Sequence, residues 1–277
     1  MVPARGRPSA SPLAMPRALV QHRELIRQLV RQELVGRYRG SLLGIAWSFA
    51  TPVLMLLIYT FVFSIVFQAR WGEALGGGRA TFAVVLFAGM TVFNLFSEVV
   101  VRAPTLVIAN ASYVKRVVFP LEVLPVVSMG AALFHFLVAL FAWGIAALAV
   151  LHRIPWTAVL LPLVIVPLML GTLGVAWVLA SLGVFLRDLA QSIGLFVTAL
   201  LFLTPIFYPV AAIPDEYQWV VTLNPLAVIV DQARQVLIFG TVPSVLSFVG
   251  SWTVALLIAA GGFAWFQKTR SGFADVL

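Results

Sequence analysis

The 277-residue chain is 62% hydrophobic and only 10% charged, with a mean hydropathy of +1.05. Soluble domains carry about 25% charged residues, so this composition excludes an ordinary water-soluble fold. The absence of cysteine excludes disulfides, iron–sulfur clusters and thiolate zinc sites. The net charge of +8 is compatible with nucleic-acid binding by itself, so the positions of the basic residues have to decide that question.

Six long runs without a charged residue divide the chain: 40–69, 80–97, 123–151, 154–186, 189–214 and 235–267. Each is close to or longer than the roughly 20 apolar residues that cross a bilayer as a helix. The runs therefore predict an all-α integral membrane protein with six transmembrane helices. The alternative, buried helices of a large soluble protein, would need polar segments that this chain lacks.

The basic residues are distributed unevenly if the N-terminus is cytoplasmic. The cytoplasmic segments then hold Arg5, Arg7, Arg17, Arg23, Arg27, Arg31, Arg37, Arg39, Arg102, Lys115, Arg116, Arg187, Lys268 and Arg270, and the external segments hold Arg70, Arg79, Arg153 and Arg234. This asymmetry follows the positive-inside rule. It predicts that both termini are cytoplasmic, and that the net charge reports orientation and contact with membrane lipids rather than nucleic acid.

The N-terminal region divides into two parts. Residues 1–16 hold four prolines and few apolar residues, so we expect a disordered N-terminus. Residues 17–36 place apolar side chains on one helical stripe, at Leu19, Ile26, Leu29, Val30 and Leu34. This pattern predicts an amphipathic helix at the cytoplasmic membrane interface. A soluble helix packed on a partner stays open as the alternative.

Within the predicted transmembrane region, 37–268, small and charged residues suggest helix contacts. Gly40 and Gly44 have the spacing that lets helices approach closely. Glu98 and Arg102 are one helical turn apart, which predicts a structural ion pair near the interface. The fourth crossing carries a stripe of small residues that predicts close packing: Gly171, Gly174, Ala176, Ala180, Ser181 and Gly183.

Residues 211–240 are too broken by proline and charge to cross the membrane, yet too apolar for an ordinary external loop. They predict re-entrant helices that dip into the outer leaflet before the last crossing, sheltered by protein. The last crossing then ends in a cytoplasmic tail, 269–277.

Several chemical signatures are absent from the sequence. There is no GxxxxGK[ST] phosphate loop and no GxSxG nucleophile motif, and His22, His135 and His152 have no metal-binding spacing. We therefore expect no metal and no cofactor in this chain. No acid lies deep within a predicted crossing, so coupling to an ion gradient is unsupported.

One cytoplasmic loop stands out between the second and third crossings. It carries Asn110, Tyr113, Lys115 and Arg116 among apolar residues. Charge alone allows a simple positive-inside anchor. A coupling element that docks in a cleft of a soluble ATPase would also explain Tyr113 and the apolar residues around it. This interpretation is favoured once the whole chain is considered.

Four motifs now support a family resemblance. They are ELVGRYRGSLLGIAWSFATPVLMLLIYTFVFSIVF at 33–67, NASYVKRVVFPLEVLPV at 110–126, FLRDLAQ at 185–191, and TPIFYP, IP and LNPL between 204 and 226. In this order the chain resembles type-2 ATP-binding-cassette (ABC) export permeases, especially those that export lipid-linked O-antigen polysaccharide in Gram-negative bacteria. The resemblance covers about residues 18–268.

The resemblance implies a homodimer in the bacterial inner membrane with two copies of a separate nucleotide-binding ATPase subunit. That partner would bind ATP and Mg²⁺, so this chain would be a transport permease and not an enzyme. The loop around Asn110–Arg116 would couple the ATPase to the permease. Arg37, Tyr38 and Arg39 would lie at the cytoplasmic gate where a diphosphate-linked lipid head enters.

Aromatic rings pack on the apolar faces of sugars, and the first and fifth crossings are rich in them. The candidates for lining a polysaccharide channel are Trp47, Tyr59, Phe63, Phe67, Phe196, Phe207 and Tyr208. Each could equally contact lipid. Likewise, Arg37 and Arg39 could pair with a diphosphate or merely anchor the interface.

Two rival functions remain open on the sequence. A capsular polysaccharide or teichoic acid exporter shares the same plan. A membrane-embedded transferase acting on lipid-linked sugars would instead need an acid or base near its substrate, for which Glu98, His135 and Asp231 are the candidates.

Overall fold

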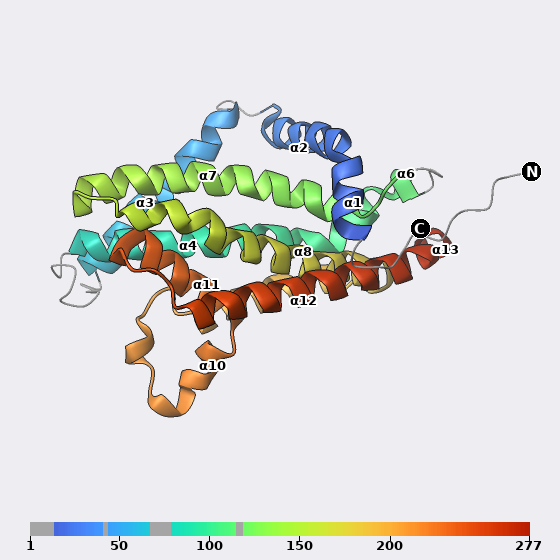
Figure 1. Ribbon diagram of the computed structural model, residues 1–277. Helices are drawn as coiled ribbons and strands as arrows, with labels where there is room; N and C mark the ends of the chain where they lie inside the picture. The colour runs from blue at the N-terminus through green and yellow to red at the C-terminus, as the bar shows by residue number, and fades with distance from the viewer. Residues whose placement is uncertain (1–13, 41–43, 67–78, 115–118) are drawn as a thin grey trace, which may run out of the picture.

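A computed structural model of the chain describes residues 14–40, 44–66, 79–114 and 119–277 (Figure 1). Three of the predicted site residues, Phe67, Lys115 and Arg116, lie outside the described residues, as does the side chain of Phe63. Most of the segment predicted to be disordered, 1–13, lies outside them as well.

The described residues form helices and no strand, as the sequence predicts. The N-terminal part comprises α1 (Ala14–Gln21), α2 (Arg23–Tyr38), a 3₁₀ turn η1 (Gly44–Ala46), α3 (Trp47–Tyr59), a π-helical segment η2 (Thr60–Val66) and α4 (Arg79–Arg102). The chain continues with η4 (Ala103–Thr105), α5 (Leu106–Ala109), α6 (Ala111–Val114), α7 (Val123–Leu151), η5 (Trp156–Leu160), α8 (Leu161–Phe185) and α9 (Leu189–Leu203). It ends with η6 (Val210–Ala212), η7 (Asp215–Tyr217), α10 (Gln218–Thr222), α11 (Pro225–Arg234), η8 (Gln235–Phe239), α12 (Val245–Thr269), η9 (Arg270–Gly272) and α13 (Phe273–Val276).

Four helical segments among the described residues are long and apolar enough to cross a bilayer: Ala80–Ala109, Val123–Leu151, Trp156–Phe185 and Val245–Val276. They coincide with the predicted second, third, fourth and sixth crossings. The predicted first and fifth crossings correspond to shorter apolar helices, Trp47–Val62 and Leu189–Leu203. The structure therefore supports a multi-helix membrane protein, while the total of six crossings stays a prediction.

Helix α4 occupies the centre of the bundle. It packs against α7, α8, α9 and α11, and every side chain from Thr81 to Phe93 is buried. A helix that is apolar all round is stable only when it is covered on all sides or faces lipid. In Figure 1 the long helices α7, α8 and α12 run in roughly the same direction as α4.

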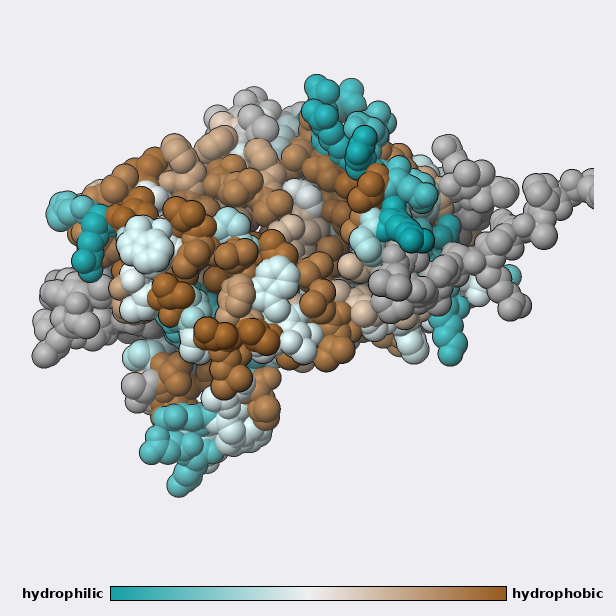
Figure 2. Space-filling view, viewed as in Figure 1, coloured by the Kyte–Doolittle hydropathy of each residue, from teal (hydrophilic) through white to brown (hydrophobic). Residues whose placement is uncertain are grey.

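The outer surface is apolar, as a lipid-facing surface must be. Leu195 on α9, Leu246 on α12 and Phe141 on α7 are 77%, 86% and 65% exposed. Figure 2 shows hydrophobic residues across the middle of one face, while hydrophilic residues gather over α1 and α2 and over the loop that carries α10. A water-soluble monomer rarely exposes such contiguous apolar area.

The small residues of α8 allow the close packing that the sequence predicts. A Cβ on Gly174 would lie 2.3 Å from the carbonyl oxygen of Ile258 on α12, and one on Gly262 would lie 2.1 Å from the carbonyl oxygen of Gly174. A Cβ on Gly183 would meet the carbonyl oxygen of Pro104 at 2.0 Å. The backbone of α8 thus packs directly on the backbone of α12 and on that of Pro104. A larger side chain at these glycines would push the segments apart.

Gly40 and Gly44, in contrast, do not serve helix packing. Both have positive φ, +84° and +51°, and an added Cβ at either would meet nothing within 4 Å. The chain leaves α2 here and enters α3, a change of direction for which glycine is suited because it has no Cβ. The prediction of a close helix approach at this pair is wrong.

The N-terminal helix also differs from the prediction. It begins at Ala14, inside the segment predicted to be disordered, and it is interrupted at His22 between α1 and α2. Helix α2 runs alongside α7 (Figure 1) and packs against it. A Cβ on Gly130 of α7 would lie 2.6 Å from Val30 of α2, so Gly130 provides the space for this contact. Whether α2 also lies at the membrane interface stays a prediction.

The broken segment before the last crossing folds into α10 and α11. Helix α11 begins at Pro225, and the Asn224 side chain accepts a hydrogen bond from the backbone N–H of Leu226 at 3.0 Å. It ends at the buried Arg234, which donates to the carbonyl oxygens of Pro205 at 2.5 Å and Ile206 at 2.7 Å. These bonds hold α11 to the end of α9. Its insertion into the outer leaflet stays a prediction.

Candidate functional site

Six polar side chains from three helices meet where α2 packs beside α7 and reaches the C-terminal part of α4. We call them the Arg37 cluster: Glu33, Arg37 and Tyr38 of α2, Glu98 and Arg102 of α4, and His135 of α7. Helical periodicity explains why Glu33 and Arg37 point the same way, because residues four apart share a face, and Tyr38 is the last residue of the helix. The antiparallel packing of α4 and α7 presents the other three side chains to this face of α2.

Arg37 and Glu98 form the central contact of the cluster. Arg37 Nη1 donates to Glu98 Oε1 at 2.5 Å, and Arg37 Nη2 lies 4.0 Å from Glu33 Oε1. The side chains of Arg37 and Glu98 are 31% and 22% exposed. Water can therefore reach the pair, which weakens the attraction between its charges relative to a buried pair.

His135 joins the pair from α7. Its Nδ1 lies 3.0 Å from both carboxylate oxygens of Glu98 and 3.1 Å from Arg37 Nη1, and its Nε2 lies 2.9 Å from the hydroxyl of Tyr38. Because a carboxylate only accepts and a guanidinium only donates, the two contacts of Nδ1 favour opposite tautomers of the ring. Burial raises the pKa of the Tyr38 phenol above its ordinary value, which keeps its hydroxyl protonated.

The structure corrects the predicted ion pair between Glu98 and Arg102. Arg102 Nη1 binds Glu33 Oε1 of α2, and Glu98 binds Arg37 and His135 instead. Both charges thus link α4 to other helices rather than to each other. The physical reason is that α2 supplies an arginine and a glutamate at the same spacing, and a pair between helices also satisfies the charges of α2.

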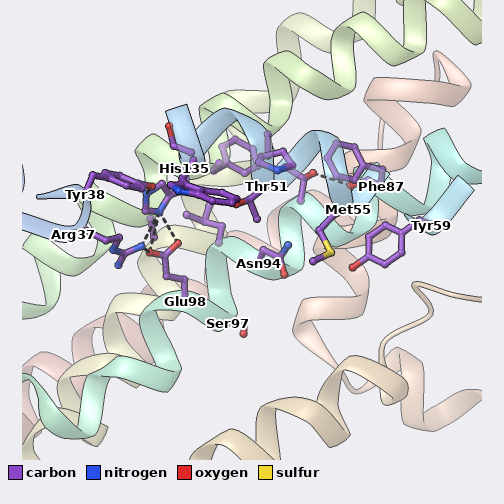
Figure 3. Close-up of a pocket in the computed structure, with 18 residues that line it drawn as sticks. Arg37, Tyr38, Thr51, Met55, Tyr59, Phe87, Asn94, Ser97, Glu98 and His135 are labelled. Carbon is purple, nitrogen blue, oxygen red and sulfur yellow. Dashed lines mark hydrogen bonds and ion pairs between the residues drawn. The ribbon is translucent and has the colours of Figure 1, made fainter. Parts of the chain in front are cut away.

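A cavity of about 390 Å³ extends from this cluster between α3, α4 and α7. Arg37, Tyr38, Glu98 and His135 lie at one end of it, and Tyr59 and Phe87 lie at the other (Figure 3). Hydroxyl and amide groups line the space between, from Ser48, Thr51, Thr91, Asn94 and Ser97. The cavity therefore has a charged end, hydrogen-bonding groups along its walls and aromatic rings, which are common features of ligand-binding sites.

The predicted gate residues separate in the structure. Arg37 and Tyr38 line the cavity, whereas Arg39 is exposed after the end of α2 and takes part in none of the ion pairs among the described residues. The role of the three residues as a gate stays a prediction. Arg37 already has an anionic partner, so it differs chemically from Arg39.

The predicted channel aromatics do not form one surface. Trp47 and Tyr59 of α3 both line the cavity. Phe196 is 60% exposed on α9. Phe207 stacks on Phe202 with ring centroids 5.7 Å apart, and the Tyr208 hydroxyl donates to the carbonyl oxygen of Phe202 at 2.6 Å. These last three lie at or after α9, away from the cavity. A lining role for them stays a prediction.

The predicted coupling loop is described on both sides of its basic pair. The Asn110 side chain donates to the carbonyl oxygen of Leu106 at 2.8 Å. Tyr113 stacks on Phe119 with centroids 4.3 Å apart and planes 16° apart. In Figure 1, α6 lies at the same end of the bundle as α1 and α13. The short helix α6 thus lies at the end of the bundle that the sequence predicts to be cytoplasmic.

A second arginine site supports this loop, and no pattern in the sequence indicated it. We call it the Arg270 clamp: Arg270 donates to Glu122 Oε2 at 2.7 Å and to the carbonyl oxygen of Phe119 at 2.9 Å. The Glu122 side chain is only 9% exposed. The indole of Trp177 on α8 donates to the Glu122 carbonyl oxygen at 3.0 Å. The clamp thereby fixes the end of the loop to α8 and to the C-terminal end of α12.

The candidate residues for transferase chemistry are only partly brought together. Glu98 and His135 are in contact, but Asp231 is exposed on α11, where its carboxylate accepts from Gln235 at 2.7 Å. Across the described residues, no three histidine or acidic side chains converge in a way that could hold a metal ion. The Glu98–His135 contact was not apparent in the sequence, because the two residues lie on different helices.

Comparison with known proteins gives a consistent result. Residues 24–238 match the family described as ABC-2 type transporter. The chain is 28% identical over 265 residues to an O-antigen export system permease protein RfbA of Klebsiella pneumoniae, covering 92% of this chain and 95% of that protein. It is 27% identical over 261 residues to the protein of the same name from Myxococcus xanthus, covering 94% of this chain and 97% of that protein.

Proposed function

The chain belongs to the ABC-2 type transporter family, and on this premise we propose that it is the transmembrane subunit of an ATP-driven exporter of lipid-linked O-antigen polysaccharide. The observation that carries the proposal is similarity along nearly the whole chain to permeases named for O-antigen export. Membership of a permease family makes the chain a transport protein rather than a transferase, although Glu98 and His135 are in contact.

In this proposal the chain works as a homodimer in the bacterial inner membrane, with six crossings per subunit and both termini in the cytoplasm. Two copies of an ABC ATPase subunit bind ATP and Mg²⁺ below it. The positive-inside distribution of basic residues supports this orientation. The chain supplies the path and its partner supplies the energy.

The coupling loop is proposed to receive the motion of the ATPase. Its support is local: α6 lies at one end of the bundle, and the Arg270 clamp, together with the bond from Trp177, ties the end of the loop to α8 and to the end of α12. A loop that is anchored in this way can transmit a displacement into the bundle, because a packed interior resists deformation.

The cargo is proposed as a glycan on a diphosphate-linked lipid. Arg37 and Arg39 are close to the start of α3, and the cavity carries hydroxyl groups and aromatic rings that suit sugars. The names of the relatives favour O-antigen over capsular polysaccharide or teichoic acid. No feature of the described residues favours either of those two cargoes.

A genetic complementation experiment tests the proposed function. The gene is deleted from its own host and restored on a plasmid, and O-antigen is measured on the cell surface and inside the cell. We expect the deletion to remove surface O-antigen, to leave lipid-linked glycan in the cytoplasmic leaflet, and to be reversed by the plasmid. Surface O-antigen that is unchanged in the deletion strain would refute the proposal.

A matched control identifies the energy source. The same measurement is made in a strain whose partner ATPase carries an inactive phosphate loop while the permease is intact. The internal glycan should accumulate as it does in the deletion strain. Normal export in that strain would show that this chain does not depend on an ATPase.

A further inference from the structure

In the Arg37 cluster, the Glu98 carboxylate binds Arg37, the one arginine that lines the cavity among the described residues, and this arrangement has a functional consequence. We propose that the cavity between α3, α4 and α7 binds the anionic phosphate head of the lipid-linked substrate, and that Glu98 is a built-in competitor that occupies Arg37 until the substrate displaces it. The identity of the ligand rests on the proposed function. The exchange itself is argued from the geometry.

The charges of the cluster balance without a ligand. The carboxylates of Glu33 and Glu98 offset the guanidinium groups of Arg37 and Arg102. An anion that entered the cavity beside Arg37 would face the Glu98 carboxylate, because Glu98 Oε1 lies 2.5 Å from Arg37 Nη1. Like charges at such short range repel strongly. The anion therefore binds only if it replaces the carboxylate at the guanidinium.

The pair is placed so that replacement is possible. The side chains of Arg37 and Glu98 are partly exposed, and both line the cavity. An ion pair in reach of water contributes little net stability, so exchanging its partner costs little. The carboxylate also keeps a second partner, because His135 Nδ1 lies 3.0 Å from both of its oxygens. Glu98 is thus not left unpaired when Arg37 turns to a ligand.

The exchange favours ligands with more charge. A guanidinium binds carboxylate and phosphate with the same planar fork of donors. A ligand that carries one negative charge offers Arg37 no more than Glu98 does, whereas a diphosphate brings additional charge and additional acceptors. The internal carboxylate therefore acts as a filter that rejects weakly charged lipids, which are abundant in any membrane.

The cavity dimensions fit the head of such a ligand rather than its whole length. A volume of about 390 Å³ lies at the lower end of the range, about 300–1,000 Å³, of small-molecule pockets. Beyond the charged end, Thr51 and Asn94 offer hydrogen bonds, and Tyr59 offers a ring (Figure 3). This sequence of groups suits a phosphate followed by a sugar.

Binding measurements on the purified permease–ATPase complex test the inference. The probe is farnesyl diphosphate, a short prenyl diphosphate, with farnesol as the uncharged comparison. Replacing Arg37 by Gln should weaken binding of the diphosphate about tenfold or more, since bonds to charged groups are strong. Replacing Glu98 by Gln should tighten it about tenfold. The double variant should bind as weakly as Arg37→Gln.

The opposite direction of the two single variants is the decisive feature. Unchanged or weaker diphosphate binding in Glu98→Gln would refute the role of Glu98 as a competitor. Unchanged binding in Arg37→Gln would refute the assignment of the diphosphate site to Arg37. Equal responses to farnesol would show that the tail alone is bound, which also refutes the proposal. Glu24→Gln is the matched control, because Glu24 is an exposed acid on α2, the helix of Arg37, and this variant should leave binding unchanged.

A second acidic variant covers the case in which Glu98→Gln does not fold. Glu98→Asp keeps the charge and withdraws it from Arg37 by one methylene group, and it should tighten binding by less than Gln does. Binding weaker than that of the natural protein would contradict the competitor. The inference can also fail separately from the proposed function: if Glu98 variants do not alter affinity while the deletion strain still loses surface O-antigen, the export function stands and the exchange does not.

Discussion

Two arginine–carboxylate sites hold this molecule together in different ways. In the Arg37 cluster the central pair is partly exposed, lines a cavity and shares its carboxylate with His135. In the Arg270 clamp the Glu122 side chain is 9% exposed, and the arginine also binds a backbone carbonyl oxygen. Each site links segments that are far apart in sequence, so each fixes tertiary structure.

The difference teaches which of the two sites can change partners. A carboxylate enclosed by protein has no water to replace its arginine, so breaking the Arg270 clamp leaves a buried charge unpaired. A carboxylate beside a cavity keeps access to water and to ligands. The clamp therefore acts as a fixed support for the proposed coupling loop, and the Arg37 cluster acts as the proposed exchangeable contact.

The largest effect is expected where the fixed site is broken. Arg270→Ala should lower the free energy of unfolding by about 3 kcal/mol, because Glu122 loses its partner in a buried position. Thermal unfolding of the detergent-purified protein measures this loss. Lys268→Ala, at an exposed basic residue two positions earlier, is the control. If Arg270→Ala melts at the temperature of Lys268→Ala, the clamp does not stabilise the fold.

The second prediction separates α2 from the bundle without touching a charged residue. Gly130→Val should force Val30 away, at a cost of about 1–3 kcal/mol for overpacking, and it should thereby pull Arg37 from Glu98 and reduce export. Gly144→Val lies on the same helix, where an added Cβ meets nothing within 4 Å. Equal export by the two variants would show that the α2–α7 contact has no role in transport.

A smaller effect is expected from the hydrogen bond that orients His135. Tyr38→Phe removes the hydroxyl that shares a hydrogen bond with His135 Nε2 and should cost about 1 kcal/mol of stability. It should also lower diphosphate binding less than Arg37→Gln does, because the guanidinium remains. Thermal unfolding and the farnesyl diphosphate measurement check both expectations. A loss of affinity as large as that of Arg37→Gln would mean that Tyr38 contacts the ligand directly.

The smallest effect is expected at the outer pair of the cluster. Arg102→Gln removes only the contact with Glu33, and both side chains of this pair are partly exposed. Exposed ion pairs contribute about 0.2–1 kcal/mol, so the unfolding temperature should fall slightly and diphosphate affinity should stay within about twofold. A destabilisation as large as that of Arg270→Ala would show that the two sites contribute equally to stability, which would contradict the distinction between them.

The sequence allowed the helical elements to be predicted better than their contacts. Uncharged runs located the apolar helices, because a bilayer imposes length and composition on a segment. The small residues of α8 predicted close packing, since only small side chains permit such an approach, and the structure identifies α12 as a partner. The same reasoning failed at Gly40 and Gly44, where positive φ serves a change of chain direction.

The polar partners could not be predicted, because they depend on how helices are placed beside each other. Glu98 and Arg102 have the spacing of a pair within one helix, yet each found a partner on α2. Arg270 and Glu122 are 148 residues apart in the chain, and no local pattern joins them. Periodicity identifies the face of a helix, but it does not identify which helix will cover that face.

Reconstitution into vesicles tests the central claim most directly. The permease and its partner ATPase are purified together and placed in lipid vesicles with a lipid-linked O-antigen glycan, and the appearance of the glycan in the opposite leaflet is followed by its accessibility to a lectin. We predict transfer that requires both ATP and the partner subunit. Equal transfer by the permease alone, without nucleotide, would contradict the account.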